Sequence, residues 1–453
     1  MTLPASLSSI AERQWQRLLA LAPHYAELPL AERDTLLQVL GLSDFVGESL
    51  IREPALLFDL LHSGELAESE RWPHYPAWLT AELDAVQDEE ALKRALRRFR
   101  RRHMVVIAWR ELLGHSEVEE SFVHLTRLAD ALIGAARDWL YDLQCRELGT
   151  PCDEAGNPQP LLILGMGKLG GGELNFSSDI DLIFTFPENG VTRGGRREMA
   201  NQPFFIKLGQ RIINALHQST ADGQVFRVDM RLRPFGDAGP LAVSFAAMED
   251  YYQHHGRSWE RYAMVKARVI GPECDYSREL GELLRPFVFR RYIDFGVIDG
   301  LRQMKAMIAA EVRRKGLVGN IKLGAGGIRE VEFIVQALQL IRGGREPALR
   351  VRHLPLALAA IEQSGALSPE SCARLLAAYR LLRRVENLLQ EIGDQQTQTL
   401  PGDERDRLRL THAMELADWD ALMSQLDSAM AAVHSEFVQV VGEEKEAPAN
   451  VAQ

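Results

Sequence analysis

The sequence has few of the features that mark secreted, membrane-spanning or hydrolytic proteins. Its four cysteines form no C-x-x-C pair and are too sparse for a disulfide scaffold, so we expect reduced thiols. No apolar run approaches the roughly 18 residues that cross a bilayer, and no secretion signal opens the chain. The 12 histidines occur in no H-E-x-x-H motif, and no G-x-S-x-G elbow is present. These absences disfavour membrane proteins and hydrolases, and they predict a cytoplasmic location.

Positive charge is not in excess either, because 63 acidic residues outnumber 52 basic ones and the formal net charge is −11. Such a chain repels polyanions except at local basic patches, so nucleic-acid binding is not expected. The strongest basic run, residues 93–103, keeps Leu92, Leu96 and Phe99 at helical spacing toward the core. We interpret the run as a solvated basic face; the alternative is a patch that binds an acidic protein surface.

The length of 453 residues and the hydrophobic content of 46% predict two or three domains with a substantial core. Helical patterns reach about Leu148, strands are expected to dominate until about residue 244, and helical patterns follow. We predict an α+β fold that is predominantly helical, with a mixed-sheet core embedded between helical regions. The expected units are residues 1–155 (helical), 156–275 (α/β core), 276–440 (helical bundle) and 441–453 (a polar tail or the start of a linker).

Residues 161–186 set a buried strand, a glycine-rich turn and a strand with two alternate aspartates in succession. Asp179 and Asp181 are two positions apart, so they project from one face of an extended strand, while Ile180 and Leu182 point into the core. Carboxylates hold hard divalent cations. The segment therefore predicts a place where a divalent metal meets a nucleotide phosphate.

A second segment, residues 225–234, alternates apolar and polar side chains and predicts another strand. Its polar face carries Asp229 together with Arg227, Arg231 and Arg233. Three carboxylates suit Mg²⁺ or Mn²⁺, and arginines bind phosphate oxygens through two parallel bonds. The two segments together therefore favour phosphoryl or nucleotidyl transfer, with Asp179, Asp181 and Asp229 as metal ligands and catalytic residues.

Two other phosphate-binding motifs fit the glycine segment poorly. Residues 165–170 match G-x-G-x-x-G, but only eight residues separate Gly170 from Asp179, whereas a βαβ crossover needs roughly 10–12. A P-loop would require Ser or Thr after Lys168, where this chain has Leu169. We therefore expect neither a dinucleotide-binding fold nor a P-loop.

Phosphate or nucleotide contacts are expected from the glycine segment and from nearby cations. The glycines let backbone N–H groups approach phosphates, and the lysines supply point charges. For Lys266, a plain surface lysine is an equally good interpretation. The residues assigned to this role are Gly165, Gly167, Lys168, Gly170, Ser178, Arg231, Arg233 and Lys266.

Two further segments receive no catalytic role. The glycines of residues 324–332 predict either a helix amino terminus that receives an anion or a tight turn into a helix. Glu386, Asn387 and Gln390 lie on an expected helix and are interpreted as hydrogen-bond partners between helices.

The segments G-M-G-K-L-G-G, S-D-I-D-L and V-D-M-R-L-R-P together resemble the core of the bifunctional glutamine synthetase adenylyltransferase/adenylyl-removing enzymes. The resemblance runs from about Leu161 to Pro401 and includes W-E-R-Y-A-M-V-K-A-R, G-G-I-R-E-V-E-F and D-Q-Q-T-Q-T-L-P. It implies a nucleotidyltransferase fold like that of DNA polymerase β. The family carries two such cores, and this chain, which has one, is more similar to the amino-terminal, adenylyl-removing copy. We expect the chain to be a fragment of a longer protein.

The resemblance implies that inorganic phosphate attacks AMP joined to a tyrosine of glutamine synthetase, giving ADP and the free tyrosine. The implied partners are glutamine synthetase, phosphate, ADP and a PII signalling protein, and the implied cofactor is Mg²⁺ or Mn²⁺. Two alternatives stay open: a forward, ATP-dependent adenylyltransferase of the same fold, and a nucleotide-binding regulatory module that docks the PII protein.

Overall fold

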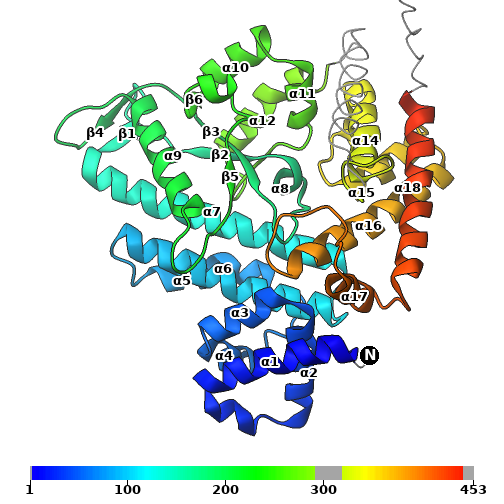
Figure 1. Cartoon of the computed structure of the whole chain (residues 1–453). Coiled ribbons are helices and arrows are strands. Elements are labelled where there is room, and N and C mark those ends of the chain that lie inside the picture. Colours follow the sequence, from blue (N-terminus) through cyan, green and yellow to red (C-terminus); the bar gives the residue numbers. More distant parts are fainter. Residues whose placement is uncertain (1–2, 291–318, 442–453) are drawn as a thin grey trace, which may run out of the picture.

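The computed structural model describes residues 3–290 and 319–441, and it is predominantly helical around a small mixed sheet (Figure 1). The predicted fold class is confirmed. The expected polar tail, apart from residue 441, lies outside the described residues. Within the described ranges, no helix is long and apolar enough to cross a membrane.

The amino-terminal region is built from helices that end near the predicted boundary at Leu148. Several begin at a side-chain cap: Ser43 Oγ accepts from the Val46 N–H, and Asp88 Oδ1 from the Ala91 N–H at 2.7 Å. The helices are α1 (Ala5–Leu21), α2 (Leu30–Leu42), α3 (Asp44–Arg52), α4 (Ala55–Ser63), α5 (Tyr75–Leu83), α6 (Glu89–Leu112) and α7 (Val118–Leu148), with 3₁₀ turns at Pro23–Glu27 and Trp72–His74.

The basic run on α6 is only in part the solvated face that the sequence predicted, because Arg94 and Arg98 are exposed but most of the run is buried. Arg97 and Arg100 are only 1% and 9% exposed. Arg97 donates to backbone carbonyls, among them Gly223 O at 2.9 Å, while Arg100 forms two bonds with Asp394. Arg97 and Arg100 are buried because the core and the carboxyl-terminal region both pack on α6 and supply oxygen acceptors.

The main sheet has strand order β5-β3-β2-β7, with β6 also pairing with β3. β2 is antiparallel to β3 and β7, while β5 and β6 are parallel to β3. The antiparallel β2–β3 pair excludes a βαβ crossover at the glycine segment, as expected. The strands are β2 (Leu162–Gly165), β3 (Ile180–Phe186), β5 (Val228–Asp229), β6 (Ala242–Ser244) and β7 (Arg268–Val269); β1 (Thr150–Cys152) and β4 (Val191–Arg193) form a separate pair.

Two expectations about the core are wrong. Strands do not dominate it, since α9 alone covers 17 residues, and residues 225–234 do not form one long strand. β5 ends at Asp229 and the chain then turns, with the Arg231 N–H donating to Asp229 Oδ1. The core helices are α8 (Gly167–Gly171), α9 (Asn201–His217), α10 (Phe245–His254), α11 (Ser258–Met264) and α12 (Asp275–Val288), with a 3₁₀ turn at Gly236–Ala238.

The carboxyl-terminal helices lie against both the core and the amino-terminal region (Figure 1). The Phe45 N–H, on α3, donates to Ile392 O at 3.1 Å, and α16 also contacts α7. The elements are α14 (Ile328–Arg342), α15 (Leu354–Gln363), α16 (Pro369–Glu391), α17 (Glu404–Ala413) and α18 (Trp419–Val441), with a 3₁₀ turn at Pro347–Leu349. Gly326, at φ 73°, forms the tight turn into α14, so the segment at 324–332 is a turn that leads directly into a helix.

Candidate active site

The three predicted carboxylates come from the neighbouring strands β3 and β5. The parallel register places Asp181 opposite Asp229, and Asp179 immediately precedes β3. Ile180 and Leu182 are both 0% exposed, so the alternation between a core face and a polar face is as predicted. Burial, followed by the negative charges of Asp179 and Asp229, raises the pKa of Asp181 from 3.8 to about 7.

Each of the outer carboxylates is turned to a partner of its own. Asp229 accepts from Arg231 Nε at 2.8 Å and from the Arg231 N–H, and Asp179 Oδ1 accepts from Gln396 Nε2 at 2.9 Å. Among the described residues, no three His, Cys, Asp or Glu side chains are grouped so that they could hold a metal ion. The pairing of β3 with β5 therefore places the three aspartates next to one another on the backbone. Their side chains, as placed, are not arranged to coordinate one metal ion.

The glycine segment contains a short helix rather than only a turn. β2 ends at Gly165 and α8 begins at Gly167, which has φ 53°. A Cβ on Gly167 would lie 3.6 Å from Asp181 Oδ2, whereas one on Gly170 would overlap Lys266 O at 1.9 Å. Gly167 thus brings backbone to the edge of the carboxylates, and Gly170 permits close packing between two chain segments.

Lys168, expected to face phosphate, is instead bound by α16. Its ammonium lies 2.8 Å from both carboxylate oxygens of Glu386 and also donates to Asn175. Also on α16, Asn387 Oδ1 accepts from the Phe176 N–H at 2.9 Å, and Gln390 Oε1 accepts from the Ser177 N–H at 2.8 Å. The expectation that these α16 side chains join helices is confirmed for Glu386, which binds Lys168 of α8, and for Asn387, which donates to Glu111 of α6 at 2.8 Å. Asn387 and Gln390 in addition hold the loop that leads into β3.

Lys266 is also buried rather than on the surface, at 4% exposed. Its ammonium lies 3.3 Å from Glu173 and 3.2 Å from Glu332. Burial alone would raise the pKa of Glu332, but the positive charge of Lys266 and of other nearby cations lowers it to about 2. Lys266 therefore joins the core to α14 through two buried ion pairs.

The remaining predicted contacts differ in how accessible they are. The side chain of Arg231 is 75% exposed and pairs with Asp229. Arg233 donates to Met230 O at 2.8 Å and pairs with Asp237 at 3.3 Å, so it braces the turn after β5. Ser178 lines a neighbouring pocket. As placed, only Arg231 lies beside a carboxylate with its guanidinium accessible.

Lys322 is a cation that the sequence interpretation missed. Its charge acts on Asp181, lowering the pKa that the two other aspartates raise, and it acts likewise on Glu332 and Glu386. In the described ranges its ammonium has no hydrogen-bond or ion-pair partner. Lys322 precedes the glycine turn of residues 324–332, so the clustered glycines were the available signal that this loop approaches the site.

Comparisons with known proteins agree with the geometry. Residues 33–281 match the sequence profile of glutamate-ammonia ligase adenylyltransferases, and residues 302–441 match that of the GlnD PII-uridylyltransferases. Two similar relatives are bifunctional glutamine synthetase adenylyltransferase/adenylyl-removing enzymes, from Shewanella loihica (55% identical over 441 residues) and Psychromonas ingrahamii (57% over 420).

The alignments cover 97% and 93% of this chain but 46% and 44% of the two relatives, so the chain spans about half the length of the curated relatives that it matches. The adenylyltransferase match extends over more than half of this chain and contains the strands of Asp179, Asp181 and Asp229. The protein therefore belongs to the glutamate-ammonia ligase adenylyltransferase family, and the core that carries these aspartates is its nucleotidyltransferase domain.

Proposed function

We propose that this chain removes AMP from an adenylylated tyrosine of glutamine synthetase by phosphorolysis, releasing ADP. The observation that carries the proposal is the register of Asp181 against Asp229, with Asp179 next to them, in a chain that spans half of two bifunctional relatives. The relatives' printed names include an adenylyl-removing activity, and the motifs around the glycine segment are more similar to the amino-terminal copy of the family's core. Both points support assigning the removing activity to this half.

The carboxylates suit a divalent cation. The pKa of Asp181 is raised to about 7 by burial and by two neighbouring carboxylates, which is the mutual repulsion that a bound cation relieves. Mg²⁺ or Mn²⁺ held by Asp179, Asp181 and Asp229 would neutralise charge on the oxygens around the reacting phosphorus. For Asp229 to serve as a ligand, the guanidinium of Arg231 must move off it, which its exposure permits.

In the proposed reaction, an oxygen of inorganic phosphate bonds to the α-phosphorus, and the bond from that phosphorus to the tyrosine oxygen breaks. The tyrosine oxygen gains a proton and the phosphate loses one, so the products are ADP and the free tyrosine. The residues of this chain bind and orient the charged groups, with no covalent intermediate required. Arg231, once released, and Lys322 are the accessible cations beside the carboxylates that can face the phosphates.

The test is incubation of the purified chain with adenylylated glutamine synthetase, phosphate and Mg²⁺. The proposal predicts ADP, phosphate-dependent and absent with the Asp181→Asn variant. AMP without ADP would indicate hydrolysis and contradict it. Transfer of label from α-labelled ATP to unmodified glutamine synthetase, with no ADP from the adenylylated form, would instead assign the forward adenylyltransferase.

Dependence on a PII signalling protein belongs to the same proposal. The resemblance implies that the uridylylated PII protein and glutamine set which of the two activities runs. We expect the rate of ADP formation to rise when a uridylylated PII protein is added to the assay. An unchanged rate would place PII recognition outside this half of the relatives.

A further inference from the structure

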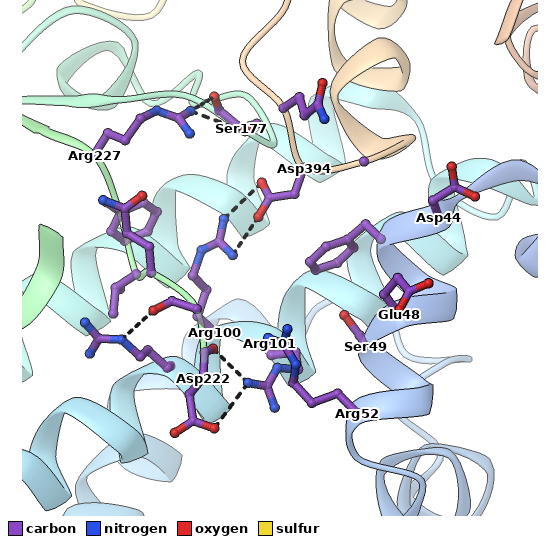
Figure 2. A pocket seen from close by; sticks show the side chains of 18 of the residues that line it. Asp44, Glu48, Ser49, Arg52, Arg100, Arg101, Ser177, Asp222, Arg227 and Asp394 are labelled. Carbon is purple, nitrogen blue, oxygen red and sulfur yellow. Dashed lines mark hydrogen bonds and ion pairs between the residues drawn. The ribbon is translucent and has the colours of Figure 1, made fainter. Parts of the chain in front are cut away.

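A pocket of about 420 Å³ lies where three parts of the chain meet (Figure 2). Its walls come from α3 and α6, from core residues 177–178 and 222–227, and from the turn at residues 393–395 that follows α16. The volume is in the range of small-molecule sites. None of the three candidate metal ligands lines it, although Ser178 in its wall directly precedes Asp179 in the chain. The pocket therefore borders the carboxylates without including them.

Every carboxylate in the pocket wall already has an arginine partner. Asp394 pairs with Arg100 at 3.0 Å and Asp222 with Arg101 at 3.6 Å. Figure 2 shows the Arg100–Asp394 pair between Arg227 on one side and Arg52 on the other. The other two acids pair with arginines outside the wall, Asp44 with Arg409 at 2.7 Å and Glu48 with Arg17 at 2.5 Å.

Three arginines in the wall have no such partner. In the described residues, Arg52, Arg97 and Arg227 form no ion pair with a carboxylate. Arg97 is buried and donates only to carbonyl oxygens. Because these acceptors carry no formal charge, its positive charge is not neutralised and acts on the pocket. The guanidinium of Arg227 donates to Ser177 O, but its Nε is buried without an acceptor. A buried donor without a partner is costly unless a ligand or water satisfies it.

We propose that this pocket binds a small anion with two or more negative charges, such as a phosphorylated metabolite or a polycarboxylate. Three guanidinium groups without carboxylate partners supply the charge, Arg227 Nε and the exposed Arg52 supply hydrogens, and the rings of Phe45 and Phe226 border the pocket. The bound anion connects α3, the strand entry at Ser177 and the turn at Asp394. This inference does not depend on the proposed function.

The test is thermal unfolding of the chain, stripped of divalent metal on a chelating resin, in millimolar inorganic pyrophosphate or citrate. Sodium chloride at equal ionic strength is the reference. We expect a higher Tm with at least one anion, because a ligand that binds only the folded state stabilises it. The stronger of the two identifies the phosphate or the carboxylate chemistry, and no rise with either anion would overturn the proposal.

Variants locate the binding. Two variants should each raise the dissociation constant of the anion at least tenfold: Arg52→Ala, which removes no bond in the described structure, and Arg227→Gln. Arg94→Ala, an exposed arginine of α6 outside the pocket, and Arg231→Ala, beside the carboxylates, should leave it unchanged. If Arg52→Ala binds as tightly as the wild type, or if Arg231→Ala abolishes binding, the pocket is not the site.

Discussion

Lys168 and Glu386 are 218 residues apart in the sequence, yet the lysine ammonium lies 2.8 Å from both carboxylate oxygens. Both side chains are largely buried, and Arg383 adds a second cation at 3.3 Å from Glu386. The pair joins the glycine segment at the carboxylates to α16. The carboxyl-terminal helices are therefore part of the framework that positions the glycine segment beside the candidate carboxylates.

This pair predicts a strong asymmetry between single and double substitutions. Glu386→Gln leaves the Lys168 ammonium buried without its counter-ion, and we expect the free energy of unfolding to fall by about 3–5 kcal/mol. Lys168→Met combined with Glu386→Gln should cost less than the sum of the two single changes. Urea denaturation of the four proteins measures the coupling. Additive losses would contradict a direct buried pair.

Lys322 is predicted to act on the reaction rather than on folding. Lys322→Met breaks no hydrogen bond or ion pair in the described structure and removes only the more distant attraction to Asp181, Glu332 and Glu386, so it should lower the free energy of unfolding by about 1 kcal/mol or less. Loss of a cation beside the phosphates should lower ADP formation by about 10- to 100-fold. Lys207→Met, an exposed lysine on α9, is the matched control. Equal rates for the two variants would exclude Lys322 from the site.

The turn after α16 is predicted to depend on the backbone of Asp394. This residue has φ 48°, which Asn tolerates better than Ala does, and its carboxylate forms two bonds with Arg100. Asp394→Asn should therefore be less destabilising than Asp394→Ala, which we expect to cost about 1–3 kcal/mol. The same turn positions Gln396, which donates to Asp179. Asp394→Ala should therefore also lower the rate of ADP formation more than Asp394→Asn does. The reverse order in urea denaturation would contradict this explanation.

Asp181 gives the metal-free protein a defined pH dependence. Its folded-state pKa of about 7 lies above the ordinary 3.8, so the folded protein binds more protons than the unfolded chain between these values. The contribution of this group to stability therefore falls as pH rises from about 4 to 7, by about 2–4 kcal/mol in total.

Asp181→Asn should remove that part of the pH dependence and raise the stability of the metal-free protein at pH 8, while it abolishes ADP formation. Millimolar Mg²⁺ should flatten the same dependence in the wild type and not in the variant. Urea midpoints between pH 5 and 8, with and without Mg²⁺, provide the check. Identical pH profiles for wild type and variant would contradict the raised pKa.

Local pattern was sufficient to predict the faces of β3. Ile180 and Leu182 are buried, and the flanking aspartates share the opposite face, because a strand alternates with a period of two. Alternation was misleading for residues 225–234. There the chain leaves the sheet after Asp229, where the Arg231 side chain and N–H bind that carboxylate and favour a turn.

Long-range partners could not be predicted from the sequence. The basic run on α6 has the composition of a solvated face, but Asp394 binds Arg100, and the carbonyls of Gly223 and Gln218 bind Arg97. Likewise, nothing local to Lys168 indicates that a glutamate on α16 will bind it. These contacts are set by how distant segments pack, and single-sequence patterns report only the local chain.

The most direct test of the account is a crystal structure of the chain with Mn²⁺ and ADP, measured for anomalous scattering. We predict an anomalous peak within coordination distance, about 2.0–2.4 Å, of carboxylate oxygens of Asp181 and Asp229, with the guanidinium of Arg231 moved off Asp229. A manganese peak bound only elsewhere, with Arg231 still paired to Asp229 beside bound ADP, would contradict the assignment of these aspartates as the catalytic centre.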